Sequence, residues 1–541
     1  MIAMDEDDIK DLLLWSNNVV SQYLKVPAKK IQIDNISYVQ KEEIGPRFAG
    51  FLKDNILLLN TKYNLDKIIK GIVLREVFLQ YLPSFCKNIP STADLGNEFA
   101  RIHLSEVESK YWHELWKLHS KRFTDGYVEY DAPQKFPLYN KYTANKFVQI
   151  VFESLNKYSE MCNTLDEVNY YRFIDEIIYE IPPRVSPSEL KILDNIDYTQ
   201  EIDIDHLLLT TGLAKRTIFS AISRLKAKGL LIEKPVYISQ KFNMPIFYVI
   251  FQRKRTELIH PSEIFVGNPF LWAYWPIISH AGGIIAVFEL YNRNRSLREF
   301  NHMLSKLRDY YNIISLQRRS YSIHTNFAIL KLIKDKWDFN WAIWLKQAQR
   351  AAKCKFNFPQ YSIYISTTLS KKYIYIANEL LKENSTISEI AKNLKLSQSE
   401  VRSIKRELYH FGYVKDYTIL GNLGLHDTLY LLIRGPISKQ KGVLNGLRKL
   451  PLIYIISDNE NSTLVRIKIP YGTSIKIGDM LRIYLQDFED LSFSIYFVGR
   501  KMEFFRNLPV EYWDTINQEF KHPPTWNDWY NQFESYFSFY Q

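Results

Sequence analysis

The sequence predicts an α+β protein of several domains, and three observations lead to this fold class. The chain has 541 residues, which is too long for one hydrophobic core. Apolar patterns typical of helices alternate with runs of β-branched and aromatic residues typical of strands. One order of short helices, strands and longer helices occurs twice, at residues 186–365 and 366–505. This second occurrence indicates an internal duplication.

The composition favours packed domains and a polyanionic partner. Hydrophobic residues make up 46% of the chain and aromatic residues 15%, which argues against extended disorder. The formal net charge is +11 and the sequence pI is about 9.1. A basic balance raises the expectation of nucleic acid or an acidic membrane surface as partner, with simple solubility as the alternative.

Cysteine content and the chain start predict a cytoplasmic protein. Cys86, Cys162 and Cys354 are odd in number and widely separated, so they predict neither a disulfide framework nor a zinc site. The first residues are acidic, unlike a secretory signal, and no apolar run approaches the ~20 residues of a membrane span. We therefore expect no membrane association.

Residues 1–125 predict a mixed α/β domain. It contains a short strand at 56–60 and a buried helix at 65–82. This strand and helix resemble the core of small zinc metallopeptidases, but Arg75-Glu76-Val77-Phe78-Leu79 stands where their HExxH motif lies. Both metal ligands are missing, so such a relative is expected to be inactive, and a plain structural helix is the alternative. Residues 126–185 predict a helical linker with a helix at 145–161.

Residues 186–244 and 366–422 each predict three short helices with a tight turn before the third. In the first segment the helices are 188–196, 203–211 and 214–229, with the turn around Gly212, and 229–251 reads as the two strands of a wing. In the second they are 373–384, 386–395 and 397–412, and 413–420 opens the wing. This order predicts two winged helix-turn-helix modules.

An α/β domain is predicted after each module. At 423–505 the order is strand, helix, strand, strand, helix, strand, which is a ferredoxin-like sandwich. At 245–365 the pattern is looser, with strands at 245–252, 283–292 and 313–323 and a helix at 296–311. Residues 506–541 form a tail dense in Trp, Tyr and Phe, which predicts packing on its own chain or on a protein partner, with base stacking as the alternative.

The third helix of each module carries the predicted DNA contacts. At 100° per residue, Ile218, Ala221, Ile222 and Leu225 share an inward face, as do Val401, Ile404 and Leu408. Arginine can grip a guanine edge or a phosphate, and serine and threonine can bond to the backbone. The predicted DNA-binding residues on or beside the outward faces are Lys215, Arg216, Thr217, Ser220, Ser223, Arg224, Ser399, Arg402, Ser403 and Arg406.

A family resemblance covers about residues 366–500. Its signals are, in chain order, Glu383-Asn384, Ile390-Ala391, Leu396-Ser397, Val401, Leu408, Leu423-Gly424 and Leu450-Pro451. With these signals the segment resembles the Lrp/AsnC (feast/famine) family of bacterial and archaeal regulators. The first half resembles it more loosely, at 280–307. Gly282-Gly283 and Asp458-Asn459 depart from the Gly-Asp pair that often opens the family's hairpin, so amino-acid effector binding is not carried over.

The resemblance implies a built-in pseudo-dimer. The family dimerises through its sandwich domains with one winged helix per chain, so two copies in one chain imply two recognition helices on a pseudo-palindromic duplex with unlike halves. We expect a transcriptional regulator that binds double-stranded DNA in the nucleoid, without cofactor, metal or enzymatic activity. The alternative is a chromatin, replication or adaptor protein whose winged helices bind DNA, RNA or protein.

Overall fold

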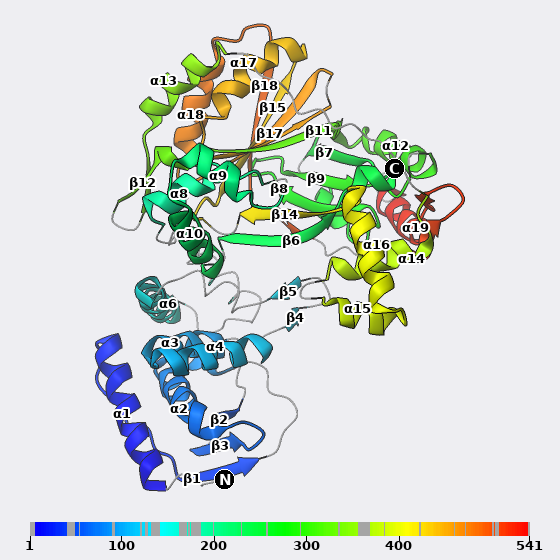
Figure 1. The fold of residues 1–541 in the computed structure, drawn as a ribbon. Coiled ribbons are helices and arrows are strands. Elements are labelled where there is room, and N and C mark those ends of the chain that lie inside the picture. Colours follow the sequence, from blue (N-terminus) through cyan, green and yellow to red (C-terminus); the bar gives the residue numbers. More distant parts are fainter. Residues whose placement is uncertain are drawn as a thin grey trace.

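The computed structural model describes most of the chain. It covers residues 6–39, 49–130, 141–161, 170, 174, 185–354, 368–503 and 508–538, with short gaps at 54, 89–91, 120–121, 125–127, 199, 229, 256–257, 293, 334–335, 383–384, 421–422, 459, 471 and 500–501. The protein is mixed α+β and multidomain, as the sequence predicts. Figure 1 shows the N-terminal part, in blue and cyan, below a larger body formed by residues 185–354, the first half, and residues 368–538, the second half.

The N-terminal part is a small sheet covered by helices. In the sheet, β3 lies between a parallel β1 and an antiparallel β2. Its elements are α1 (Glu6–Leu24), β1 (Asn35–Val39), β2 (Gly50–Lys53), β3 (Ile56–Asn60), α2 (Leu65–Tyr81), η2 (Ser84–Asn88), α3 (Thr92–His103), α4 (Glu106–His119), the hairpin β4 (Arg122–Thr124) and β5 (Val128–Tyr130), and α6 (Lys141–Met161).

Helix α6, expected as part of a linker, packs into the core of this N-terminal domain. Phe147, Val151 and Leu155 are buried in the same cluster as residues of α2 and α3. Of the rest of the segment expected as a linker, the structure describes β5, Tyr170, Ile174 and Val185, and Tyr170 and Ile174 join this core.

The first half begins with three short helices, followed by strands and helices in alternation. They are α8 (Pro187–Leu193), α9 (Ile204–Thr211), α10 (Lys215–Ala227), β6 (Leu231–Tyr237), η4 (Ser239–Phe242), β7 (Ile246–Arg253), α11 (Pro261–Ile264), β8 (Leu271–Pro276), β9 (Gly283–Glu289), α12 (Arg295–Leu307), β10 (Tyr311–Gln317), β11 (Ser320–Thr325), η5 (Phe327–Ile329), β12 (Leu330–Ile333), β13 (Lys336–Phe339) and α13 (Trp341–Ala351).

The second half repeats this order. Its elements are α14 (Lys371–Leu380), α15 (Ile387–Leu394), α16 (Gln398–His410), β14 (Val414–Leu420), β15 (Asp427–Arg434), α17 (Ile437–Leu447), β16 (Leu452–Ser457), β17 (Ser462–Ile469), α18 (Ser474–Leu485), β18 (Ser492–Val498), β19 (Met502–Glu503), η6 (Val510–Tyr512), β20 (Trp513–Asp514), β21 (Glu519–Phe520) and α19 (Thr525–Ser538).

The two large sheets exchange edge strands. One has the order β10-β7-β9-β8 and the other β18-β15-β17-β16. Counted from β7 and from β15, each sheet therefore has its strands in the order fourth, first, third, second. The fifth strand comes from the other half in both sheets: β19 pairs with β8, and β11 pairs with β16. The stretch 313–323, expected as one strand, is therefore two strands in different sheets, with the break at Arg318–Arg319.

The expected wing strands also pair differently. Strand β6 of the first half pairs with β14 of the second, from Leu231↔Leu420 to Tyr237↔Val414, and we call this pair the ribbon. The second strand expected in the first wing is β7, which lies in a large sheet instead. Alternation of apolar and polar residues marks a strand but does not name its partner, which is why the exchange was not predicted.

The two large sheets face each other across an apolar layer. Tyr248 and Trp275 of the first sheet and Tyr430 and Leu432 of the second are buried in it. The outer face of the second sheet and its helices α13, α17 and α18 share a core with α8, α9 and α10. The first three-helix unit is thus fixed on the sheet of the second half.

The aromatic tail packs on its own chain. Trp526, Trp529 and Phe533 of α19 are buried in the core of the first sheet, and Trp529 Nε1 donates to the carbonyl of Ile264 at 3.2 Å. Upstream, Trp513 Nε1 donates to the carbonyl of Leu369 at 3.2 Å, which ties the tail to α14. No helix in the described ranges is both long and apolar enough to cross a bilayer.

Candidate nucleic-acid interface

Gly212, in the left-handed backbone conformation, forms the turn before α10. Gly212 ends α9 with φ 63°, and a Cβ placed there would meet no atom within 4 Å. Asp203 caps the start of α9 by accepting from the amides of Asp205 and His206. Ile218 and Leu225 of α10 are fully buried against α8 and α9, so the opposite face of α10 points away from the core.

The second unit has the same local design with different residues. Lys395 takes the left-handed position of the turn, with φ 54°. Thr386 and Glu389 form a capping box on α15, and the Ser397 hydroxyl accepts from the amide of Glu400 at 3.2 Å at the start of α16. Val401 and Leu408 are fully buried, which sets the outward face of α16.

The structure brings the predicted residues of α10 onto one accessible surface. Lys215, Arg216, Thr217, Ser220, Ser223 and Arg224 are all exposed. Arg224 is already engaged: its Nε donates to Glu189 Oε1 at 3.0 Å and its Nη1 to Ser220 Oγ at 2.7 Å. Burial raises the pKa of Glu189, but the Ser186 amide, Lys228 and Arg224 outweigh it and lower that pKa overall. Arg224 therefore stabilises the buried Glu189 carboxylate in addition to lying on the predicted contact surface.

The predicted residues of α16 are exposed as well. These are Ser399, Arg402, Ser403 and Arg406. Arg402 Nη2 donates to Gln398 Oε1 at 3.2 Å, and the Ser403 hydroxyl donates to Glu407 Oε1 at 3.5 Å. Such contacts between exposed side chains are weak and exchange readily for a ligand.

The ribbon sets the separation of the two helices. Strand β6 follows α10 and β14 follows α16, and their antiparallel register places the two helix C-termini at opposite ends of the ribbon. Figure 1 shows α10 at one end and α16 at the other. Seven paired residues of strand span about 20 Å.

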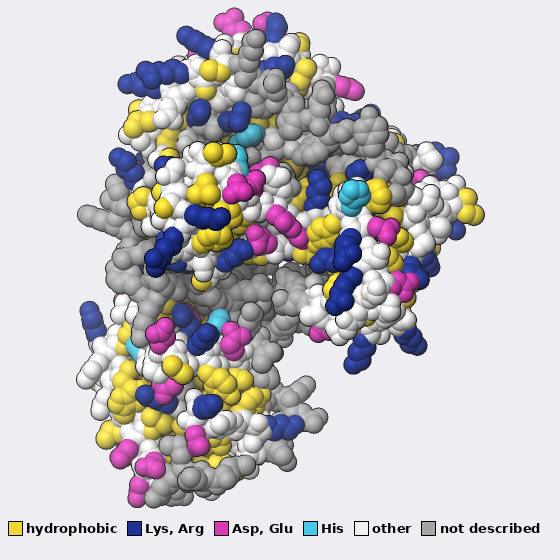
Figure 2. Space-filling view, in the orientation of Figure 1, with side chains coloured by type: hydrophobic (Ala, Val, Ile, Leu, Met, Phe, Trp, Pro, Cys, Tyr) yellow, Lys and Arg dark blue, Asp and Glu magenta, His cyan; other side chains and the backbone are white. Residues whose placement is uncertain are grey.

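Acidic side chains lie between the two basic helices. Figure 2 shows Lys and Arg over α10 and α16 and Asp and Glu between them. A shared hydrogen bond with Asp416 raises the pKa of Glu201, with Glu233 adding to the rise. Glu233 also accepts from Lys226 Nζ at 2.5 Å. Glu201 precedes α9, Glu233 lies in β6 and Asp416 lies in β14, so the sequence gave no signal that these carboxylates gather.

Sequence reasoning also missed Phe219, which lies on α10 beside the predicted contacts. Its side chain is 51% exposed. The sequence could have indicated this exposure, because Phe219 directly follows the buried Ile218 and lies 100° away from it around the helix.

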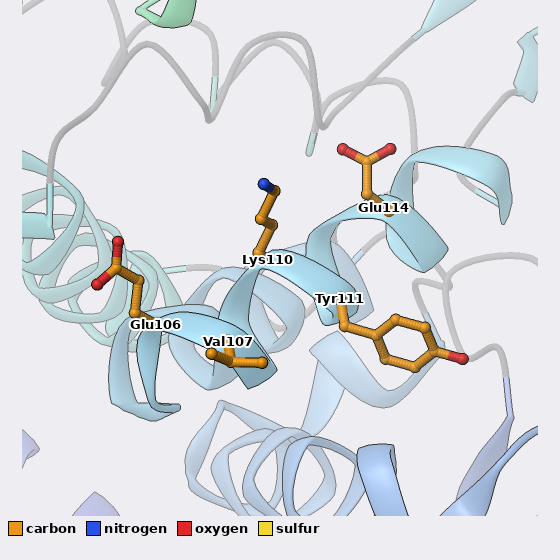
Figure 3. Close-up of a pocket in the computed structure, with 5 residues that line it drawn as sticks. All are labelled: Glu106, Val107, Lys110, Tyr111 and Glu114. Carbon is orange, nitrogen blue, oxygen red and sulfur yellow. The ribbon is translucent and has the colours of Figure 1, made fainter.

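The N-terminal domain contains a buried ion pair and a surface hollow. Arg75 and Glu76 are buried, with Arg75 Nε donating to Glu76 Oε1 at 2.8 Å, and Arg75 also donates to the carbonyl of Gly50. No cluster of three metal-binding side chains occurs within the described part of the chain. The hollow in Figure 3 runs along α4 and is lined by Glu106, Val107, Lys110, Tyr111 and Glu114. Figure 3 shows these side chains fanning out from one helix rather than converging, so they do not assemble a reactive centre.

Comparisons with known proteins give likenesses to solved structures and no match to a family or a curated protein. No family model matches the chain, and no curated protein is significantly similar to it. Among solved structures, the crystal structure of the siroheme decarboxylase NirDL aligns with 65% of this chain and 99% of its own, at 12% identity and a TM-score of 0.37. The same enzyme in complex with an iron-uroporphyrin III analogue aligns with 64% and 98%, at 13% identity and a TM-score of 0.37.

This likeness corrects one expectation from the sequence. At 12% identity and a TM-score of 0.37, the likeness does not place this chain in a family. The neighbours are structures of an enzyme, which contradicts the expectation that this chain has no enzymatic activity. At this similarity the comparison assigns neither a reaction nor a ligand to the chain.

Proposed function

We propose that the chain is a DNA-binding transcriptional regulator that uses two winged helices as a pseudo-dimer on one duplex. In this proposal α8–α10 and α14–α16 are the helix-turn-helix modules, with α10 and α16 as recognition helices. The four strands that each half supplies to its own sheet form a ferredoxin-like sandwich with that half's helices. The observation that carries the proposal is the ribbon, which holds two exposed, arginine-bearing helices at its opposite ends.

The repeated design of the two modules supports this proposal. Both third helices have 13 residues, both follow a residue in the left-handed conformation, and both bury one face. The strand order in each half is that of a ferredoxin-like fold. A repeated unit with matched turns and matched exposed helices favours a two-fold symmetric target, and a duplex with two half-sites has that symmetry.

Spacing supports a duplex target. Half-sites that lie on one face of B-DNA are separated by about 34 Å, one helical turn. The ribbon accounts for about 20 Å between the helix C-termini. Each 13-residue helix is about 20 Å long, so the separation of the helix centres can reach one helical turn of DNA.

The charge pattern predicts how the duplex is held. Arg216 and Arg406 have no acidic partner within the described parts of the chain and can donate to phosphates or guanine edges. The ribbon itself carries Glu233 and Asp416 beside Lys234 and Lys415, so its formal charges cancel. Contacts with the duplex are therefore expected mainly at the two helices.

The test is selection of duplexes from a random pool by the purified full chain at two salt concentrations. A two-part motif is expected, enriched by ~10³-fold or more over random duplex. The double variant Arg216→Ala, Arg406→Ala is expected to lose this enrichment. A matched control removes the same charge elsewhere: Lys346→Ala, Arg350→Ala, both exposed on α13, should keep it.

Two other outcomes decide against a specific regulator. Salt-sensitive retention without an enriched motif would indicate an architectural DNA-binding protein. No retention at low salt would contradict DNA binding altogether and would direct attention to RNA or protein partners.

A further inference from the structure

We propose that Phe219 reads the 5-methyl group of a thymine in the half-site that α10 contacts, while Arg402 reads a guanine edge at the matching place in the other half-site. The inference rests on the proposed DNA-binding function and names what each half-site contains. The chain would then read an asymmetric sequence with an apolar contact in one half and a charged contact in the other.

The two recognition helices can be aligned residue by residue from their buried faces. Buried Ile218, Ala221 and Leu225 of α10 have the same spacing as buried Val401, Ile404 and Leu408 of α16. The left-handed turn residues Gly212 and Lys395 keep the same register. In this alignment Phe219 matches Arg402, and Ser220 matches Ser403.

Phe219 is an unusual residue for its position. Its side chain is 51% exposed, although phenylalanine is mostly buried in folded proteins. On the helix it lies next to Arg216 and Ser223, three residues before and four residues after it, which are themselves predicted contacts. No aromatic ring or cation among the described residues stacks on it. An accessible phenylalanine beside the predicted contact residues can contact an apolar group on the edge of a base.

The chemistry of the nucleobases indicates which apolar group this is. In the major groove, the thymine methyl is the one apolar group that distinguishes a base pair, and phenylalanine is among the side chains that contact it. Arginine instead donates bidentately to guanine O6 and N7. Arg402 is exposed, and its recorded side-chain hydrogen bond to Gln398, at 3.2 Å, joins two exposed side chains. The same helix position therefore offers different base contacts in the two modules.

The acidic residues of α16 strengthen this difference. Glu400 accepts from Lys372 Nζ at 2.5 Å and Glu407 accepts from the Tyr373 hydroxyl at 2.6 Å, so both carboxylates are held by α14. The residues that match them on α10 are Thr217 and Arg224. The second module (α14–α16, module 2) thus presents arginines beside two carboxylates that α14 holds in place, whereas the first (α8–α10, module 1) presents an aromatic ring among Arg, Thr and Ser.

The experiment changes one chemical group of the DNA at a time. In the duplex selected by the full chain, each thymine is replaced in turn by deoxyuridine, which lacks only the 5-methyl group. One position, in the half-site bound by module 1, should weaken binding about four-fold, since a buried methyl is worth about that much in affinity. With Phe219→Ala this loss should vanish, and with Phe219→Leu it should persist.

Two matched controls complete the design. Ile475→Ala removes an exposed apolar side chain on α18, where it is 82% exposed, and should leave the deoxyuridine loss intact. Replacing guanines of the other half-site by 7-deazaguanine removes N7, and the resulting loss should vanish in Arg402→Ala. Because Phe219 is half exposed, Phe219→Ala should keep the wild-type circular dichroism spectrum.

The outcomes separate this inference from the proposed function. If the chain binds a specific duplex but no thymine is sensitive to deoxyuridine, or Phe219→Ala retains the full loss, the reading by Phe219 is overturned and DNA binding stands. A module 1 half-site without thymine would also overturn it. If the chain binds no specific duplex, the proposed function fails and this inference fails with it.

Discussion

Lys234 of β6 and Tyr417 of β14 pair at the middle of the ribbon, so the strand that leaves α10 and the strand that leaves α16 are tied at their centres. Because β6 follows α10 and β14 follows α16, this pairing makes the separation of α10 and α16 a property of the folded chain rather than of a flexible linker. The predictions below follow from this arrangement and from the contacts around it.

Arg216 and Arg224 should respond differently to truncation. Arg216→Ala should weaken DNA binding and reduce the slope of log affinity against log salt by about 1, because one phosphate contact is lost. Its stability should not change. Arg224→Ala removes one contact to buried Glu189 and should also lower the unfolding free energy, by about 0.5–1 kcal/mol, because Lys228 and the Ser186 amide still hold this carboxylate. Urea unfolding and salt-dependent binding separate the two; equal stability losses would contradict this assignment.

The two left-handed turn positions predict stability changes of opposite sign. Gly212→Ala should destabilise by about 1 kcal/mol, because the backbone penalty acts although the added Cβ has open space. Lys395→Gly should stabilise by a similar or smaller amount, since it relieves the same penalty. Urea midpoints of both variants provide the measurement. A gain from Gly212→Ala would show that this turn differs from the one described.

Asp194 should make stability depend on pH. Its carboxylate accepts from the amides of Phe327 and Ala328, and burial raises its pKa to about 6, against the opposing hydrogen bonds. The folded protein therefore holds this proton more tightly than the unfolded chain, whose pKa is near 3.8. The Asp194 contribution to stability should rise as pH falls from about 6 to about 4.

The variant Asp194→Asn isolates that contribution. Its unfolding free energy, subtracted from that of the wild type at each pH, removes the other carboxylates from the comparison. The difference should change between pH 4 and pH 6 and be flat above pH 7. A flat difference across the whole range would show that Asp194 titrates normally.

Trp529 should be essential to the stability of the first sheet domain. Its side chain is 4% exposed and lies in the core that α19 forms with this sheet. Trp529→Ala should cost about 3–5 kcal/mol, from the cavity and the lost packing. Asn527, exposed on the same helix, is the control: Asn527→Ala should change stability by less than about 0.5 kcal/mol. Equal losses would contradict the packing of the tail.

The sequence supports the local structure far better than the long-range pairing. Ile218, Leu225, Val401 and Leu408 follow the helical period, so their burial was predictable. The exchange of β11 and β19 between the sheets was not, because the period of a strand says nothing of its neighbour. The gathering of Glu201, Glu233 and Asp416 was missed for the same reason. These residues meet only through the β6–β14 pairing and the packing around it.

The spacing of the half-sites tests the central claim most directly. In the selected duplex, five base pairs are inserted between the two half-sites, which turns one half to the opposite side of the helix, about half of a 10.5-base-pair turn. Because the ribbon fixes α10 and α16, wild-type affinity should fall to that of a duplex with a single half-site. The variant Arg406→Ala, which depends on module 1 alone, should not respond to the insertion. Wild-type affinity that is unchanged by the insertion would contradict a rigid pair of recognition helices.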